Sequence, residues 1–129
     1  MSSFECQDNC AMNENDYAPD EMHPIPSVDA CDIEAARTDG GADLVIVIAA
    51  PIANDQRSRL RLMKKVENYL GYINSQSFAQ RYGPPSPDRT GIIVRYHPHC
   101  AMGLIRLIEE CRGWIEDNGA VLSLQPIDQ

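Results

Sequence analysis

The residues of this chain best suited to chemistry lie in one segment, Tyr96-His97-Pro98-His99-Cys100. A cysteine at the start of a helix has its thiolate favoured by the helix dipole, and a nearby imidazole favours it further. The candidate ligand pocket or nucleophilic site therefore consists of Tyr96, His97, His99 and Cys100. No orienting acid and no oxyanion loop accompany them in the sequence, and an imidazole that caps a helix end is the simpler interpretation.

The cysteines are the second set of residues with chemical potential. They number five, at Cys6, Cys10, Cys31, Cys100 and Cys111. An odd number argues against a disulfide framework. The Cys6 and Cys10 pair is spaced more widely than the Cys-x-x-Cys pairs of zinc sites and has no matching second pair. We predict no metal site and no cofactor and, because phosphate-binding and hydrolase motifs are also missing from the sequence, no catalytic residues.

Charge is distributed unevenly along the chain. There are 11 basic and 19 acidic residues, which give a net charge of −8. Residues 1–43 hold eleven of the acids and one base, so this part of the chain favours a basic protein partner such as a toxin domain. The acids expected to be fixed by folded structure, and therefore to bind that partner, are Asp29, Asp32, Glu34, Asp39 and Asp43. Neutralising Asp32 and Glu34 should then weaken binding and leave the melting temperature nearly unchanged.

The composition also excludes some partners. A strongly acidic chain is unsuited to nucleic acid or to an anionic membrane surface. The longest apolar stretch, 44–53, is about half of the roughly 20 residues that a membrane-spanning helix needs. The first residues lack the basic and apolar regions of a signal peptide, so we expect a cytoplasmic protein.

Hydrophobic periodicity predicts a single domain preceded by an arm. Residues 1–26 are acidic, contain three prolines and show no apolar period, so we expect a flexible arm there and a domain over residues 27–129. The predicted elements are strands at 28–37 and 43–50, a helix at 54–75, a short helical turn at 77–82, a strand at 90–96, a helix from about 98–101 to 117 and a strand at 120–125. This β-β-α-β-α-β order predicts an α+β fold, a two-layer α/β sandwich whose four-stranded mixed sheet carries two helices on one face.

Each predicted helix has one apolar stripe. In the first helix the stripe is Leu60, Met63, Val66, Leu70 and Ile73, and in the second it is Leu104, Leu107, Ile108, Cys111 and Ile115. The other side of the first helix carries Arg57, Arg61, Lys64 and Lys65, and a solvated face is the simplest interpretation of these bases. The acidic arm has two alternative docking surfaces, which are a basic surface of a partner protein and the basic side of this helix.

The segment 60–78 resembles an uncharacterised bacterial domain family of unknown function. In that family a hairpin precedes a helix that ends in a Leu-x-x-Tyr-Leu-x-Phe/Tyr-Ile-x-Ser pattern. The matching residues here are Tyr69, Leu70, Tyr72, Ile73 and Ser75. The resemblance covers roughly residues 28–126 and implies a ββαβαβ domain. In size and charge the chain is also similar to the small acidic immunity proteins that are encoded beside bacterial toxins.

These observations favour a protein-binding function. We hypothesise an immunity protein, or antitoxin, that neutralises a cognate toxin by occluding its basic active site. Two alternatives remain open. One is a small enzyme or ligand-binding module around His97, His99 and Cys100, and the other is an interaction domain that associates with itself as a homodimer.

Overall fold

The computed structural model describes residues 18–38 and 40–127 of the chain. Its elements are, in order, β1 Ile33–Ala36, β2 Ala42–Ile48, α3 Gln56–Ile73, α4 Gln76–Tyr82, β3 Thr90–Tyr96, α5 Met102–Glu110, α6 Arg112–Asp117 and β4 Val121–Pro126. The strands lie in the order β1-β2-β3-β4, with β1 antiparallel to β2 and the other neighbours parallel. The predicted α+β class with a four-stranded mixed sheet is confirmed. Within the described ranges, no helix has the length and apolar character needed to cross a membrane.

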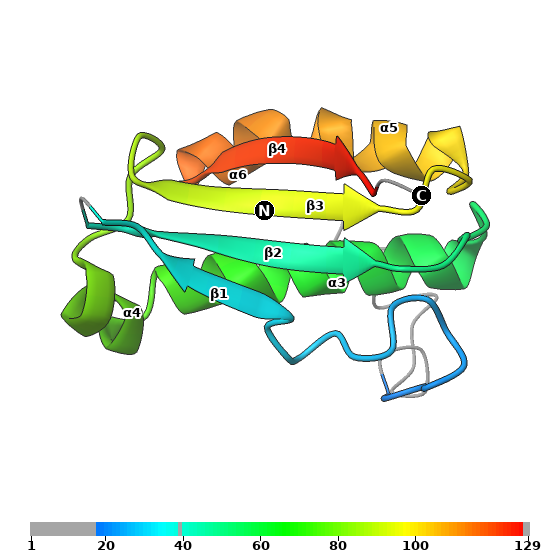
Figure 1. Ribbon diagram of the computed structural model, residues 1–129, viewed down its shortest axis with the longest axis horizontal. Helices are drawn as coiled ribbons and strands as arrows, with labels where there is room; N and C mark the ends of the chain where they lie inside the picture. Colours follow the sequence, from blue (N-terminus) through cyan, green and yellow to red (C-terminus); the bar gives the residue numbers. More distant parts are fainter. Residues whose placement is uncertain (1–17, 39, 128–129) are drawn as a thin grey trace.

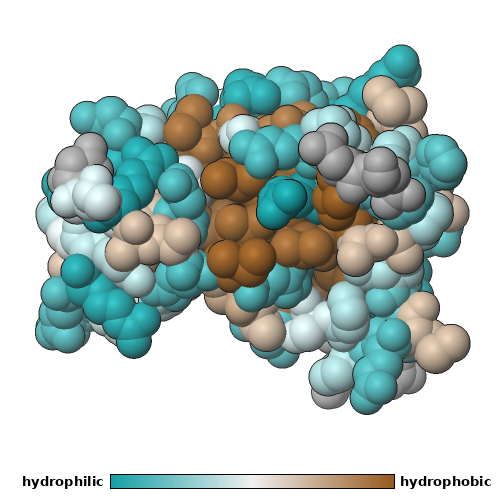
Figure 2. Space-filling view, viewed as in Figure 1, coloured by the Kyte–Doolittle hydropathy of each residue, from teal (hydrophilic) through white to brown (hydrophobic). Residues whose placement is uncertain are grey.

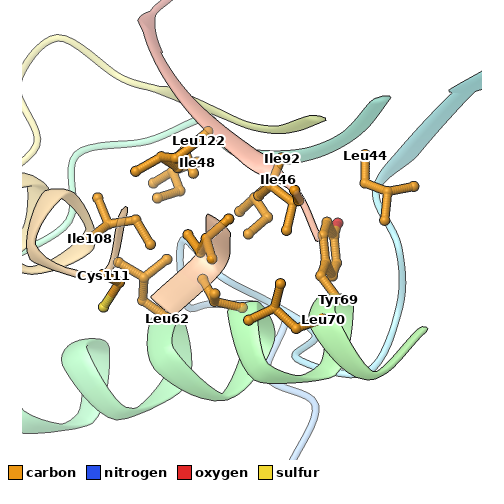
Figure 3. Close-up of a cluster of buried hydrophobic side chains, with 14 of the residues drawn as sticks. Leu44, Ile46, Ile48, Leu62, Tyr69, Leu70, Ile92, Ile108, Cys111 and Leu122 are labelled. Carbon is orange, nitrogen blue, oxygen red and sulfur yellow. The ribbon is translucent and has the colours of Figure 1, made fainter. Parts of the chain in front are cut away.

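The core lies between the helices and one face of the sheet. Figure 1 shows α3 and the α5–α6 segment running along the far face, while no helix of the described residues lies on the near face. Alternate side chains of β2, such as Leu44, Ile46 and Ile48, enter the core beside the helices (Figure 3). Leu70 and Ile108, which the apolar stripes assign to the interior, are 4% and 0% exposed.

The turn between β1 and β2 depends on glycine. Gly41 has a φ of +85°, and a Cβ atom there would lie 2.0 Å from the carbonyl oxygen of Arg89. Only glycine adopts such a backbone without steric cost. The close approach lets the N–H of Ala42 donate to that carbonyl at 3.1 Å, which aligns β2 with the start of β3.

Side-chain caps determine where α3 and α4 begin. The carboxylate of Asp55 accepts a hydrogen bond from the N–H of Ser58 at 2.7 Å, and the hydroxyl of Ser75 accepts one from the N–H of Phe78 at 3.2 Å. Both caps satisfy N–H groups that have no partner inside the helix. The predicted start of the first helix, at residue 54 or 55, agrees with this cap.

The helical layer differs from the sequence prediction in two places. The predicted second helix is divided at Cys111, whose N–H donates to the carbonyl of Ile108, three residues back, at 3.0 Å. This tighter turn interrupts the α-helical hydrogen-bond pattern. On α3, the prediction of a solvated basic side is wrong for Arg61 and Lys65, which are 0% and 1% exposed because the segment before β1 covers them.

Residues 18–32, which we call the strap, form that cover. Ile25 and Val28 in the strap are 1% and 2% exposed and belong to the core cluster. The prediction of an arm that extends to residue 26 therefore needs correction for residues 18–26, which pack on the domain. The first strand also begins at Ile33 instead of Val28, because the preceding residues bind α3. Residues 1–17 of the predicted arm lie outside the described residues.

Candidate functional site

The histidine–cysteine segment forms a tight turn between β3 and α5. The N–H of His97 donates to the carbonyl of Ile48 at 2.8 Å, and the Nδ1 atom of His97 accepts from the N–H of His99 at 3.0 Å. The two imidazole rings have centroids 5.3 Å apart. Tyr96, the last residue of β3, is half-buried beside them in sequence. The structure therefore brings the two histidines together, and the hydrogen bonds show them closing the turn.

Cys100 is buried in this turn. It is 6% exposed, and its thiol points to the carbonyl of Ala50 at 3.8 Å. Burial raises the pKa of the Cys100 thiol. A reactive cysteine needs an exposed thiol with a lowered pKa. Cys100 precedes Ala101, the N-cap of α5, and burial outweighs the backbone hydrogen bonds that act to lower the pKa of its thiol.

The cysteines and histidines do not converge on a metal in the described part of the chain. Among residues 18–38 and 40–127, no group of three or more His, Cys, Asp or Glu side chains is placed to hold an ion. Cys111 is buried against the core, and burial raises the pKa of its thiol. Cys6 and Cys10 lie outside the described residues.

Asp32, one of the acids predicted to bind a partner, is bound within the chain. Its carboxylate lies 2.8 Å from the Nζ atom of Lys65 and accepts a hydrogen bond from the N–H of Val47 at 2.9 Å. Lys65 also donates to the carbonyl of Ser27 at 2.7 Å. Asp32 therefore joins the strap to α3 and to the edge of β2.

The other predicted partner-binding acids also have contacts inside the molecule. Asp43 forms an ion pair with Arg37 at 2.6 Å across the end of the hairpin. Asp29 accepts a hydrogen bond from the side chain of Asn68 at 3.3 Å. Asp39 lies outside the described residues.

Glu34 connects β1 with α4. Its carboxylate accepts hydrogen bonds from the Tyr72 hydroxyl at 3.0 and 3.1 Å, from the Tyr82 hydroxyl and from Arg81 at 3.2 Å. Burial acts to raise the pKa of Glu34, but these hydrogen bonds outweigh it and hold the pKa below its ordinary value. The carboxylate is therefore ionised at neutral pH and holds α4 against the sheet.

Arg61 and Lys65 are the buried charges that the sequence pattern misses. The guanidinium of Arg61 donates to the carbonyl of Ala18 at 2.9 Å and to that of Ile25 at 2.9 and 2.6 Å. These bases lie four residues apart, in line with Arg57 and Tyr69 on α3. That spacing, together with two apolar residues in the strap, is the only signal in the sequence that could have indicated a covered basic stripe.

His23 in the strap meets Ser58 of α3 in an arrangement that resembles a nucleophile and its base. The Nε2 atom of His23 is 3.0 Å from the Ser58 hydroxyl, and the Nδ1 atom accepts a hydrogen bond from the N–H of Ile25 at 2.9 Å. Because Nδ1 is the acceptor, the proton of the neutral ring is on Nε2, which cannot take a proton from Ser58. Ser58 is also only 2% exposed, so the pair joins the strap to α3.

The open face of the sheet carries aliphatic side chains. The register places Ile33, Val45 and Ile93 in one row across three strands, and alternation places Val47 and Val121 on the same face. Ile33 is 44% exposed, Val47, Ile93 and Val121 are half-buried, and Val45 in the middle of the row is buried at 7% exposed. Figure 2 shows apolar side chains gathered over the strands on this face, with a hydrophilic residue among them. We call Ile33, Val45, Val47, Ile93, Arg95 and Val121 the open face.

Arg95 is the charged member of the open face. It is exposed and stands in register between Val47 of β2 and Gln125 of β4. Within the part of the chain that the structure describes, its guanidinium forms no ion pair and no hydrogen bond. By contrast, Arg37, Arg57 and Arg112 each pair with a carboxylate.

Comparison of the chain with protein-family models, with curated proteins and with solved structures found no match. The resemblance to an uncharacterised bacterial domain family therefore stays a prediction. Residues that carry it also have structural roles here, since Leu70 and Ile73 are buried in the core and Ser75 caps α4.

Proposed function

We propose that this protein is a binding protein and that the open face of its sheet docks on another protein. The proposal depends on one observation, a largely half-buried aliphatic surface that no helix of the described residues covers and that has an exposed arginine in it. Protein interfaces combine an apolar centre with anchoring residues, among which arginine is enriched. The histidine–cysteine turn supports catalysis less well, because its cysteine is buried and its thiol pKa is raised.

The chemistry of the open face defines the partner that fits it. A partner that covers Ile33, Val47 and Ile93 needs aliphatic side chains of its own. It would also take Arg95 out of water, which is costly unless a carboxylate pairs with the guanidinium. We therefore propose a protein partner that presents an apolar surface with an acidic side chain positioned to meet Arg95.

The edges of the sheet offer less to a partner than its open face. At one end of the four-residue strand β1, the carbonyl of Val45, which lies opposite Ile33, accepts a hydrogen bond from the Tyr69 hydroxyl at 2.9 Å. At the other edge, Arg112 donates to the carbonyl of Leu122 in β4 at 2.8 Å. Side chains thus occupy backbone groups that strand addition would use.

An immunity protein that blocks a bacterial toxin is the particular form of this function that the composition favours. The described residues hold thirteen acids and eleven bases, so most of the net charge of −8 comes from the remaining residues. That charge would speed the approach of a basic toxin, because complementary charge raises association rates. In this proposal the open face supplies the contact area and the acidic residues supply attraction at a distance.

A charge reversal on the open face tests the proposal. Arg95→Glu changes the open face, and Arg106→Glu makes the same change at an exposed position on α5. We expect a protein from the native host to co-purify with the wild type and with Arg106→Glu, and its recovery to fall at least about tenfold with Arg95→Glu. Quantitative mass spectrometry of the three eluates provides the measurement.

Two results would contradict the proposal. Equal recovery of the same partner by both variants would show that the open face is not the contact. A wild-type dimer in light scattering that Arg95→Glu dissociates would show that a second copy of this chain covers the open face. Circular dichroism of both variants checks that the charge reversals leave the fold intact.

A further inference from the structure

The strap is held to α3 by three kinds of contact that do not respond to mild acid. Ile25 and Val28 are buried in the core, and Arg61 and Lys65 donate to strap carbonyls. Near the start of the strap, Arg57 forms an ion pair with Asp20 at 2.9 Å. These contacts persist between pH 5 and pH 8, because arginine, lysine and an ion-paired aspartate keep their charges over that range.

His23 supplies a fourth kind of contact, which depends on one protonation state of its ring. The Nδ1 atom accepts the N–H of Ile25 at 2.9 Å, and the Nε2 atom bonds to the hydroxyl of Ser58 at 3.0 Å. A second proton would place an N–H at Nδ1 directly against the N–H of Ile25. The ring would then lose this hydrogen bond and set two donors against each other.

The surroundings of His23 also favour the neutral ring. Burial lowers the pKa of His23 from its ordinary value of 6.5, and the charges of Arg61 and Arg57 on α3 lower it further. Asp55 at the start of α3 and Asp20 in the strap act in the opposite direction but do not offset these effects. Cations and anions therefore face the ring from both elements, and the net effect opposes protonation.

We propose that His23 makes the attachment of the strap to α3 sensitive to pH, so that mild acid opens the strap and exposes the covered basic stripe of Arg61 and Lys65. This device is independent of the open face. The imidazolium form is compatible with the open strap and is disfavoured in the closed one. Acidification thus shifts the equilibrium between the two through a single proton.

Linkage gives the direction and the size of the effect. The closed strap binds the proton less well than the open one, so the attachment is complete above pH 6.5 and weakens as the pH falls below that value. Each pH unit between the two pKa values contributes a factor of ten. At pH 5.0 the opening equilibrium should increase by up to about 30-fold over its value at pH 7.5.

Hydrogen exchange of the full chain measures this opening. The N–H of Ile25 and the N–H of Asp20, which donates to Pro26 at 2.9 Å, report on the strap. After correction for intrinsic exchange rates, their protection should fall by up to about 30-fold from pH 7.5 to pH 5.0. Protection in β2 and β3 should stay the same. Protection of the strap that does not change with pH would overturn the proposal, as would an equal loss throughout the domain.

Two variants identify the responsible histidine. An asparagine oxygen can accept the N–H two residues further on, so His23→Asn keeps an acceptor for Ile25 and has no proton to gain. We expect this variant to have strap protection independent of pH. His97→Asn is the matched control, because His97 accepts the N–H of His99 in the same way, and it should keep the wild-type response of the strap. A pH response that survives in His23→Asn would contradict the proposal.

A titration of the wild-type ring gives a test that does not depend on any variant. The NMR signals of His23 report its protonation state directly. The proposal requires the folded-state pKa of His23 to lie below 6.5. A value at or above 6.5 would overturn it.

Discussion

The ammonium group of Lys65 is almost fully buried, and the strap supplies both of its acceptors. The carbonyl of Ser27 lies 2.7 Å from it and the carboxylate of Asp32 lies 2.8 Å from it. Removing one member of a buried pair is costly, because the other charge stays buried without its partner. The prediction that neutralising Asp32 and Glu34 together leaves the melting temperature nearly unchanged does not follow from this geometry.

Truncating Asp32 should therefore destabilise the protein. We expect Asp32→Ala to lower the free energy of unfolding by roughly 2–4 kcal/mol, because Lys65 and the N–H of Val47 both lose an acceptor. Glu67→Ala is the control, since Glu67 and Lys64 form an exposed pair at 3.2 Å, and it should cost less than about 0.5 kcal/mol. Urea unfolding followed by circular dichroism measures both. Equal losses would mean that Asp32 does not stabilise the buried lysine.

Residue types alone could not reveal which acids of the candidate site face solvent. The count of acids before residue 44 is correct, but the side-chain partners of Asp32 and Glu34 lie 33 and 38 or more residues away in sequence, respectively. Such pairs form only after the strap and α4 have packed. Arg95, in contrast, was visible as a charged residue within a predicted strand, and its position on the open face follows from alternation.

At the scale of elements, regular patterns were predictable and irregular segments were not. In β2 apolar residues occupy both alternating faces, as in a strand buried on both sides, and in α3 they recur with the period of a helix buried on one side. The division at Cys111 carries no such signal, because this residue lies on the apolar stripe and is buried. The strap has only Ile25 and Val28 as apolar anchors, and two residues do not make a period.

Two glycines, one in a helix and one in a turn, differ in whether the backbone requires glycine at that position. Gly71 lies within α3, and a Cβ atom there would have no atom within 4 Å. Gly71→Ala should raise the free energy of unfolding by about 0.5–1 kcal/mol, because alanine loses less backbone entropy in a helix. Gly41→Ala should lower it by at least about 2 kcal/mol, since φ is positive and the carbonyl of Arg89 occupies the space.

Thermal and urea unfolding of the two glycine variants provide the measurement. A destabilised Gly71→Ala would show that α3 needs flexibility or close approach at that position. A neutral Gly41→Ala would show that the turn between β1 and β2 can adopt another backbone.

At the scale of the whole molecule, the net charge of the full chain differs from the charge balance of the described residues. Eleven of the thirty charged residues are bases, and all eleven lie in the described part, where thirteen acids nearly balance them. Four of these acids form ion pairs with bases of the same chain, namely Asp20, Asp32, Glu34 and Asp43. The acids that suggested a basic partner thus also hold the strap and the hairpin in place. The open face is therefore the better candidate for specific contact with a partner.

The extent of the folding unit depends on whether the strap belongs to it, and Ile25 provides the test. Its side chain is 1% exposed in the core, and its carbonyl accepts two hydrogen bonds from Arg61 that a side-chain truncation leaves in place. Ile25→Ala should therefore cost roughly 2–4 kcal/mol of unfolding free energy through lost burial alone. Met22→Ala in the same strap, where the side chain is 92% exposed, should change it by less than about 0.5 kcal/mol. If chemical denaturation gave equal small values for both, the strap would unfold separately, and the cooperative domain would begin near Ile33, at the start of β1.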